Sequence, residues 1–330
     1  MIQTALTTIT PRQLLSFPQV GQDPDVLAQL LADKRSANTR RAYAGDVKDF
    51  FKTITGELPN KLLVTEFLRL PEREAVALVL KWKAVMLSGE GRKKPLSEAT
   101  INRRLAAIKS LVTMGQNLGV SNFNLARVKG ETVAKYRDTT GIDIPTFERI
   151  LSTCNRETVA GKRDYALLRL LWGNALRRNE VSQLSLADFD ARASTLRILG
   201  KGKGTQYQSV DVGAATAQAI SEWLAVRPGT ATDTDPIFIA LNYAALGHRL
   251  TGDGLYKLVQ TRTKKAGIEK VMSPHRIRHS AITAALDATD GNVRKVQKLS
   301  RHKSLNTLMI YDDNRGRDQK DVTDLLDGMF

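Results

Sequence analysis

The second half of the chain carries six side chains whose types suit attack on a phosphodiester. They are Arg177, Lys201, His275, Arg278, His302 and Tyr311. Negative charge grows and spreads over the phosphoryl oxygens in the transition state, and arginines stay charged at working pH and can donate paired hydrogen bonds to those oxygens. A tyrosine hydroxyl has a pKa of about 10 and becomes a nucleophile when its proton is removed. These residue types predict phosphodiester cleavage that needs no metal ion or other cofactor.

Two of these residues are spaced so that one helix would present both. His275 and Arg278 are three residues apart and would share a helix face. Ser273 and Pro274 come just before them and are typical of a helix N-cap and first turn, an end of a helix that favours anions. His275 is the hypothesised base that accepts the proton of the nucleophile, and His302 is expected to hydrogen-bond the phosphate. An alternative is a capped basic helix on the surface.

A lysine on a glycine-rich turn supplies the hypothesised general acid. Residues 200–204 read Gly-Lys-Gly-Lys-Gly and separate two strands that we predict at 194–199 and 206–212. Lys201 would protonate the leaving oxygen of the phosphodiester. Lys203 is the competing candidate, and a solvated turn without a catalytic role is a further alternative.

Together these motifs resemble the tyrosine site-specific recombinases, the phage integrase family that includes Cre-like and Xer-like enzymes. Four segments occur in the family's order: Arg177 with an acidic residue, Glu180, three positions later; the glycine-flanked Lys201; the His275-x-x-Arg278 box; and His302 with Tyr311 nine positions later. The resemblance is strong over residues 143–315 and weaker over 36–130, where Ser36-x-x-Thr39-Arg40-x-x-Tyr43 is similar to the start of the family's core-binding domain.

The resemblance also identifies two departures and leaves one role open. Ala175 stands where the family frequently has glycine, and Arg301 stands where glycine is usual. We expect Arg301 to tilt His302 or to add a phosphate contact. Glu180 would orient Arg177 or Arg278, or would be an ordinary surface residue.

Membership in this family implies a defined reaction and defined partners. A 3′-phosphotyrosyl bond would conserve the energy of the broken DNA strand, and the free 5′ hydroxyl of another strand would attack it, so that strands exchange through a Holliday junction without ATP. The implied partners are double-stranded DNA with a specific site, built from inverted repeats around a short spacer, and three further copies of the chain in a homo-tetramer. A type IB topoisomerase-like enzyme and a non-catalytic architectural DNA-binding protein are the alternatives.

Composition agrees with a nucleic-acid partner. The 330 residues have a net charge of +16 and a pI of about 10.0, and both halves of the chain are basic. Neutralising phosphates with such a surplus releases counterions and promotes binding to a polyanion. Cys154 is the single cysteine, so an internal disulfide is excluded, and no apolar run reaches the roughly 18 residues that span a bilayer. We therefore expect a cytoplasmic, nucleoid-associated protein.

Hydrophobic periodicity predicts a mainly α-helical chain with a small antiparallel β-sheet. The expected parts are a flexible arm at 1–22, a helical core-binding domain at 23–124, a basic linker at 125–142, a mixed α/β catalytic domain at 143–315, and a tail helix at 316–330. The tail helix would dock on a neighbouring protomer, or alternatively pack on its own domain.

Basic residues in both expected domains are candidates for contact with DNA. They are Arg40, Arg41, Arg103, Arg104, Lys109, Arg127, Lys129, Lys203 and Arg276. On the helix predicted after Ser97, the basic residues lie opposite an apolar stripe, which suits a helix that packs on a core and faces DNA. A merely solvated basic face would have the same pattern.

Overall fold

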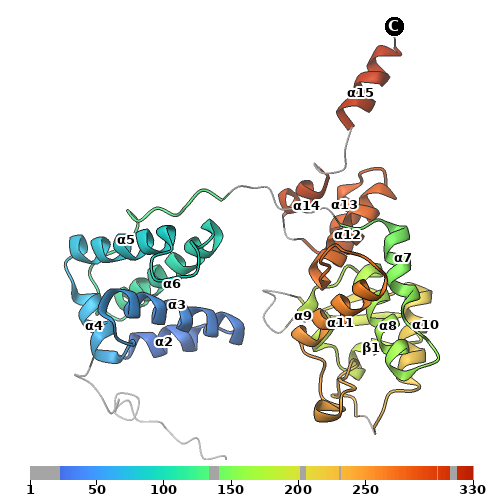
Figure 1. The fold of residues 1–330 in the computed structure, drawn as a ribbon, viewed down its shortest axis with the longest axis horizontal. Coiled ribbons are helices and arrows are strands. Elements are labelled where there is room, and N and C mark those ends of the chain that lie inside the picture. The colour runs from blue at the N-terminus through green and yellow to red at the C-terminus, as the bar shows by residue number, and fades with distance from the viewer. Residues whose placement is uncertain are drawn as a thin grey trace, which may run out of the picture. The chain divides into compact units, whose positions relative to one another are not determined.

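The computed structural model describes residues 23–133, 141–200, 206–229, 232–302, 304–312 and 318–329. The chain divides into two compact units, with the division between Tyr136 and Arg137. Both units are mostly helical, and the described strands form one small antiparallel sheet (Figure 1), which confirms the predicted fold class.

Unit 1 is a helical unit whose helices begin and end at recognisable capping residues. Its helices are α2 (Val26–Asp33), α3 (Ala37–Thr55), α4 (Lys61–Arg69), α5 (Glu72–Ser88) and α6 (Glu98–Asn117). The side chains of Asp25, Ser36 and Asn60 accept backbone N–H groups at the starts of α2, α3 and α4. Gly56 and Gly89 end α3 and α5 at φ values of 81° and 77°, a left-handed conformation that glycine adopts without steric cost.

Aromatic side chains dominate the core of unit 1. Phe50 makes edge-to-face contacts with Phe67 and Trp82, at ring-centroid distances of 5.0 and 5.2 Å. The structure differs here from the expected linker, because Leu125 and Val128 are buried in this same core. Residues 125–131 therefore pack on unit 1. The segment is polar overall, so its composition did not indicate that Leu125 and Val128 would be buried.

Unit 2 combines helices with the three-stranded sheet. Its α-helices are α7 (Ile144–Ser152), α8 (Val159–Gly173), α9 (Arg178–Gln183), α10 (Ala214–Leu224), α11 (Gly252–Lys265), α12 (Pro274–Asp287), α13 (Val293–Ser300), α14 (Leu305–Asp312) and α15 (Asp318–Asp327); its 3₁₀ turns are η1 (Leu186–Asp188) and η2 (Tyr243–Ala245).

The sheet runs in the order β1 (Phe189–Asp190), β2 (Thr195–Leu199), β3 (Tyr207–Asp211), with every pair antiparallel. Leu196 and Ile198 point into the core from β2, while the alternating residues Arg197 and Leu199 are exposed. The β2 and β3 strands lie where the sequence predicts them, whereas the two-residue β1 is too short to give an alternating pattern.

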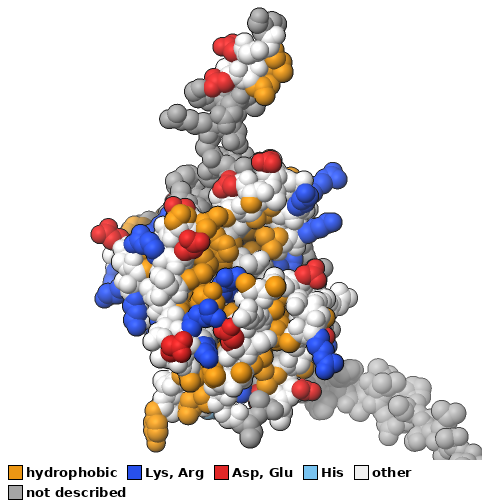
Figure 2. Space-filling model, turned by 90° about the vertical axis from the view of Figure 1, so that its right-hand side faces the viewer, with side chains coloured by type: hydrophobic (Ala, Val, Ile, Leu, Met, Phe, Trp, Pro, Cys, Tyr) orange, Lys and Arg blue, Asp and Glu red, His pale blue; other side chains and the backbone are white. Residues whose placement is uncertain are grey.

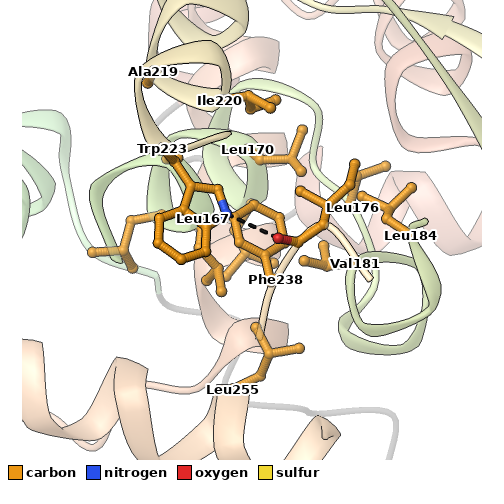
Figure 3. Close-up of a cluster of buried hydrophobic side chains, with 14 of the residues drawn as sticks. Leu167, Leu170, Leu176, Val181, Leu184, Ala219, Ile220, Trp223, Phe238 and Leu255 are labelled. Atoms are coloured by element: carbon orange, nitrogen blue, oxygen red, sulfur yellow. Dashed lines mark hydrogen bonds between the residues drawn. The ribbon is translucent and has the colours of Figure 1, made fainter. Parts of the chain in front are cut away.

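The main core of unit 2 forms where α8 packs against α10, and Figure 3 shows its central side chains. Leu167 and Leu170 from α8 lie beside Ile220 and Trp223 from α10. The indole N–H of Trp223 donates to the backbone carbonyl of Ile237 at 2.9 Å, which satisfies a buried donor. This core supports the end of α8, from which the segment leading to Arg177 departs.

A smaller apolar cluster fastens the three helices α12, α13 and α14 to one another. Its members include Ile282 from α12, Val296 from α13 and Leu308 from α14, each at most 2% exposed. Ala175, from the segment after α8, belongs to the same cluster. The cluster therefore brings together the segments that carry Arg177, His275 with Arg278, and Tyr311, together with α13, which leads directly to His302.

Helix α15 exposes apolar side chains in the described part of unit 2. Leu325 and Leu326 of this helix are 61% and 53% exposed, and Met329, two residues after its end, is 66% exposed. Figure 2 shows hydrophobic side chains gathered on one side of this helix. Among the described residues, no helix has the length and apolar character needed to cross a membrane.

Candidate active site

Helix α12 presents His275 and Arg278 as their spacing predicts. The Ser273 hydroxyl accepts a hydrogen bond from the backbone N–H of Arg276 at 3.1 Å, and Pro274 forms the first turn. His275 is exposed at this helix end, whereas Arg278 is 1% exposed. The local sequence thus sets where the helix begins, and packing against the rest of unit 2 buries the arginine.

Two segments of unit 2, at Ala175 and at Ser300–His302, hold the guanidinium of Arg278. It donates hydrogen bonds to the backbone carbonyls of Ala175 and Ser300, and its Nη2 lies 3.2 Å from Nε2 of His302. Carbonyl oxygens satisfy the donors of a buried guanidinium. These contacts hold the positively charged Arg278 beside His302.

His302 is neutral at physiological pH in this environment. Burial, followed by the positive charges of Arg278 and Arg177, lowers the pKa of His302 to about 4. Arginine can only donate, so Nε2 of His302 is the acceptor in its contact with Arg278, and the ring proton belongs on Nδ1. A bound phosphate would offset the two arginines and raise this pKa.

Arg177 and Glu180 form a local pair at the start of α9. A carboxylate oxygen of Glu180 accepts the backbone N–H of Arg177 at 2.8 Å, and the other accepts its Nη1 at 2.8 Å. The Glu180 side chain is 2% exposed and that of Arg177 is 29% exposed. Burial opposes ionisation of Glu180, but the charges of Arg301 and Arg177 outweigh it and lower the pKa of the carboxyl. Glu180 is therefore a buried anion that contacts Arg177 and Arg301.

The two departures from the family pattern both have left-handed backbone. Ala175 has φ 43° and Arg301 has φ 57°, a region that favours glycine. Arg301 is 8% exposed in its side chain and forms an ion pair with Glu180 at 3.0 Å. Its guanidinium is directed into the protein in this structure, toward Glu180.

His279 is a residue of this site that the sequence analysis did not select. It is 7% exposed, and its Nε2 lies 2.7 Å from Nε2 of His275. The two rings meet edge to face at a centroid distance of 4.1 Å. One ring must donate and the other accept, so that His279 restricts the tautomer and orientation of His275. The four-residue spacing of the two histidines on one helix is the sequence signal that would have indicated this pair.

Two of the six predicted catalytic residues are not described at the level of their side chains. Lys201 and the competing Lys203 lie outside the described residues. The backbone of Tyr311 lies in α14, which begins three residues after His302 and which buried Leu308 anchors. The described part of the site therefore consists of Arg177, His275, Arg278 and His302, with Glu180, His279 and Arg301 around them. Among the described residues, no group of three His, Cys, Asp or Glu side chains is arranged to hold a metal ion.

The basic candidates on α6 differ in what they contact. Arg104 bonds to Asp49 and lies 3.7 Å from Asp46, with 16% of its side chain exposed. Arg103, 46% exposed, pairs with Asp46. Lys109 donates to the backbone carbonyl of Val128 at 2.7 Å. Internal partners thus hold these three side chains in place, and Arg104 is the most enclosed of them.

The remaining candidates lie nearer the solvent. Arg40 donates to the carbonyl of Lys34 at 2.7 Å, and Arg41 to the side chain of Asn38 at 2.5 Å. The Arg127 side chain is 83% exposed, and Lys129 is also exposed. Arg276, on the exposed side of α12, donates to the carbonyl of Val271 at 2.8 Å.

Comparison with known proteins places this chain among relatives of one family. The model of the phage integrase family matches residues 143–317. Tyrosine recombinase slr0733 of Synechocystis sp. is 48% identical over 93% of this chain and 96% of its own length. The tyrosine recombinase XerC of Corynebacterium efficiens is 30% identical over 91% of this chain and 88% of its own length.

A solved structure shows the same fold. The XerH site-specific recombinase bound to a palindromic difH substrate aligns with a TM-score of 0.61 and 19% sequence identity, over 92% of this chain and 95% of that chain. The family match covers more than half of the chain, and the recombinase relatives cover nearly all of it. The chain belongs to the phage integrase family and is a tyrosine recombinase, an enzyme that breaks and rejoins DNA strands.

Proposed function

We propose that this recombinase cleaves each DNA strand with the hydroxyl of Tyr311 and holds the strand as a 3′-phosphotyrosyl bond. The observation that carries the proposal is the convergence of Arg278 and His302, 3.2 Å apart, next to a helix that includes Tyr311. Arg177 is close enough to lower the pKa of His302 by its charge. Two arginines and a neutral imidazole are the groups that a phosphodiester needs as its charge grows.

The balance of the cleavage step assigns a role to each residue. The oxygen of Tyr311 forms a bond to phosphorus, the bond to the 5′ oxygen breaks, and the tyrosine proton goes to His275. Lys201 supplies the proton that the leaving 5′ oxygen takes up. Arg177 and Arg278 neutralise the non-bridging oxygens, and His302 hydrogen-bonds the phosphate. Attack by another strand's 5′ hydroxyl reverses these steps.

The proposed partners are duplex DNA and other copies of the chain. The XerH structures hold difH substrate before and after cleavage. By extension, we propose that this chain acts at a specific site with inverted repeats around a short spacer. Four copies would assemble on paired sites and exchange strands through a Holliday junction, and we propose that they act in the cytoplasm on cellular DNA. The exposed apolar residues of α15 are suited to docking on a neighbouring protomer. The same proposal includes the six catalytic residues, the division into a core-binding and a catalytic domain, and the basic residues named above as candidate DNA contacts.

Covalent capture tests the nucleophile. Wild-type protein is incubated with nicked duplexes drawn from a random-sequence library, and the DNA that stays attached in denaturant is sequenced to obtain the site. Tyr311→Phe is expected to bind the recovered duplex and to form no adduct. Tyr243→Phe is the matched control because Tyr243 is fully exposed, and it should form the adduct normally. An adduct from Tyr311→Phe at the wild-type level contradicts the proposal.

The same reagents distinguish recombination from DNA relaxation. A supercoiled plasmid with two copies of the recovered site should give deletion or inversion products, and a plasmid without the site should keep its supercoils. Rapid relaxation of both plasmids without recombinants would instead identify a topoisomerase-like activity.

A further inference from the structure

Arg301 sits at a backbone conformation that is costly for its residue type. It ends α13 at φ 57° and directly precedes His302. A non-glycine residue in the left-handed region costs roughly 1–2 kcal/mol. Such strain persists where surrounding contacts hold the residue in place. The contacts of the Arg301 side chain therefore explain how this conformation is kept.

The guanidinium of Arg301 contacts backbone from two separate segments. Its Nη1 donates to the carbonyls of Leu299 at 2.7 Å and Asn174 at 3.2 Å, and its Nη2 reaches the carbonyl of Ala175 at 3.4 Å. The Ala175 carbonyl also accepts from Arg278. Arg301 thus connects the end of α13 with the segment after α8, at the same carbonyl that holds Arg278.

The fourth contact places Arg301 on the acidic partner of Arg177. The two oxygens of Glu180 accept from Arg177 at 2.8 Å and from Arg301 at 3.0 Å. With one arginine alone, the buried carboxylate would cancel the positive charge of Arg177. The second arginine leaves the group of three residues with a net charge of +1, available to an anion. Arg301 acts on both arginines that flank His302, through Glu180 on one side and through Ala175 on the other.

We infer that Arg301 is a positioning residue of the phosphate site. It fixes Arg177 and Arg278, and it leaves the group of Arg177, Glu180 and Arg301 with a net positive charge, without touching the DNA itself. The inference rests on the proposed function. The sequence analysis expected Arg301 to tilt His302 or to contact the phosphate. In the structure its side chain is instead buried and contacts Glu180 and backbone carbonyls.

The test uses the recovered DNA duplex with two kinds of scissile group, a normal phosphodiester and an uncharged methylphosphonate. Arg301→Gln should lower the single-turnover cleavage rate on the phosphodiester by about 10- to 100-fold. This loss is at most similar to the rate loss that follows removal of a side chain that donates directly to a transition-state oxyanion, because Arg301 acts through other residues. Its affinity for the duplex should change less than threefold. On the methylphosphonate the ratio of wild-type to variant rates should fall below threefold, because the site then needs less positive charge.

A second arginine–carboxylate–arginine group in unit 2 provides the matched control. Asp164 lies 2.7 Å from Arg163 and 2.7 Å from Arg262, and all three side chains are at most 12% exposed. Arg163→Gln removes one arginine from that group and should leave the cleavage rate within threefold of wild type. Arg301→Lys should recover part of the lost rate, since it keeps the charge.

The outcomes separate the inference from the proposed function. If wild-type protein forms no adduct on the phosphodiester, the proposed function fails. If wild type cleaves and a folded Arg301→Gln cleaves within twofold of it, or if its defect is as large on methylphosphonate, the inference is wrong. Arg301→Gly relieves the left-handed strain and keeps the test available if the glutamine variant does not fold. It should show the same phosphate-specific loss.

Discussion

Replacing Glu180 by glutamine tests how the buried carboxylate supports unit 2. Glutamine has almost the same shape and can still accept the backbone N–H of Arg177, which Glu180 bonds at 2.8 Å. What it removes is the negative charge between two arginines. The Glu180 side chain is 2% exposed and that of Arg301 is 8% exposed, so water cannot readily replace the lost partner.

The expected loss in the free energy of unfolding follows from these contacts. Removing one partner of a buried ion pair costs roughly 3–5 kcal/mol. Arg301 keeps its backbone carbonyl acceptors, and Arg177 is partly exposed to water. These two facts reduce the expected cost to roughly 2–3 kcal/mol. For a unit of this size each kcal/mol lowers Tm by roughly 2–4 °C, which gives a decrease of about 4–12 °C.

Calorimetry of the full chain measures this decrease, and hydrogen exchange in α9 and α13 assigns it to unit 2. Glu222→Gln is the matched control, because Glu222 pairs with Arg156 at 2.5 Å on the surface, with 29% and 46% of the two side chains exposed. That variant should lose at most about 1 kcal/mol. A Glu180→Gln protein as stable as the Glu222→Gln protein would refute the argument that Glu180 is a buried, charged link.

Two further predictions concern pH and the basic face of unit 1. The folded-state pKa of His302 is about 4, below its ordinary value of 6.5. As the pH falls from 6.5 toward 4, the unfolded chain therefore binds a proton that the folded chain does not bind. The free energy of unfolding should fall in that pH range. Urea titrations should show a smaller fall for His302→Gln, and equal pH dependence would contradict the assigned pKa. On α6, Arg104→Gln should destabilise unit 1 by roughly 2–3 kcal/mol, because Arg104 pairs with largely buried Asp49 and Asp46. Arg127→Gln, at an 83% exposed side chain, should keep the stability and weaken DNA binding, and a reversed ranking in melting and filter-binding assays would count against this assignment.

Local features of the site could be predicted from the sequence because they depend on neighbouring residues. The cap at Ser273, the first turn at Pro274, and the shared face of His275 and Arg278 follow from spacing within one helix. The β2 and β3 strands follow from alternation and an intervening glycine-rich turn. The family motifs then supplied the roles of these residues.

The interactions between distant segments were decided by the tertiary structure. The sequence left open whether Glu180 serves Arg177, Arg278 or neither. The structure pairs Glu180 with its near neighbour Arg177, and packing adds the distant Arg301 as a second partner. The basic pattern on α6 did not reveal that Arg104 faces two aspartates. Partners more than fifty residues apart in the chain meet only when helices pack, so residue spacing carries little information about them.

For the site itself, the sequence determined which reactive groups are present and in what order, and the comparisons established the family. The tertiary structure decided the charge states of these groups and the contacts that hold them in place. It buried His302 beside Arg278, which lowers its pKa to about 4, and turned Arg301 inward at a left-handed position. Burial and the field of nearby charges depend on atoms from several segments at once, which is why these properties arise only in the folded chain.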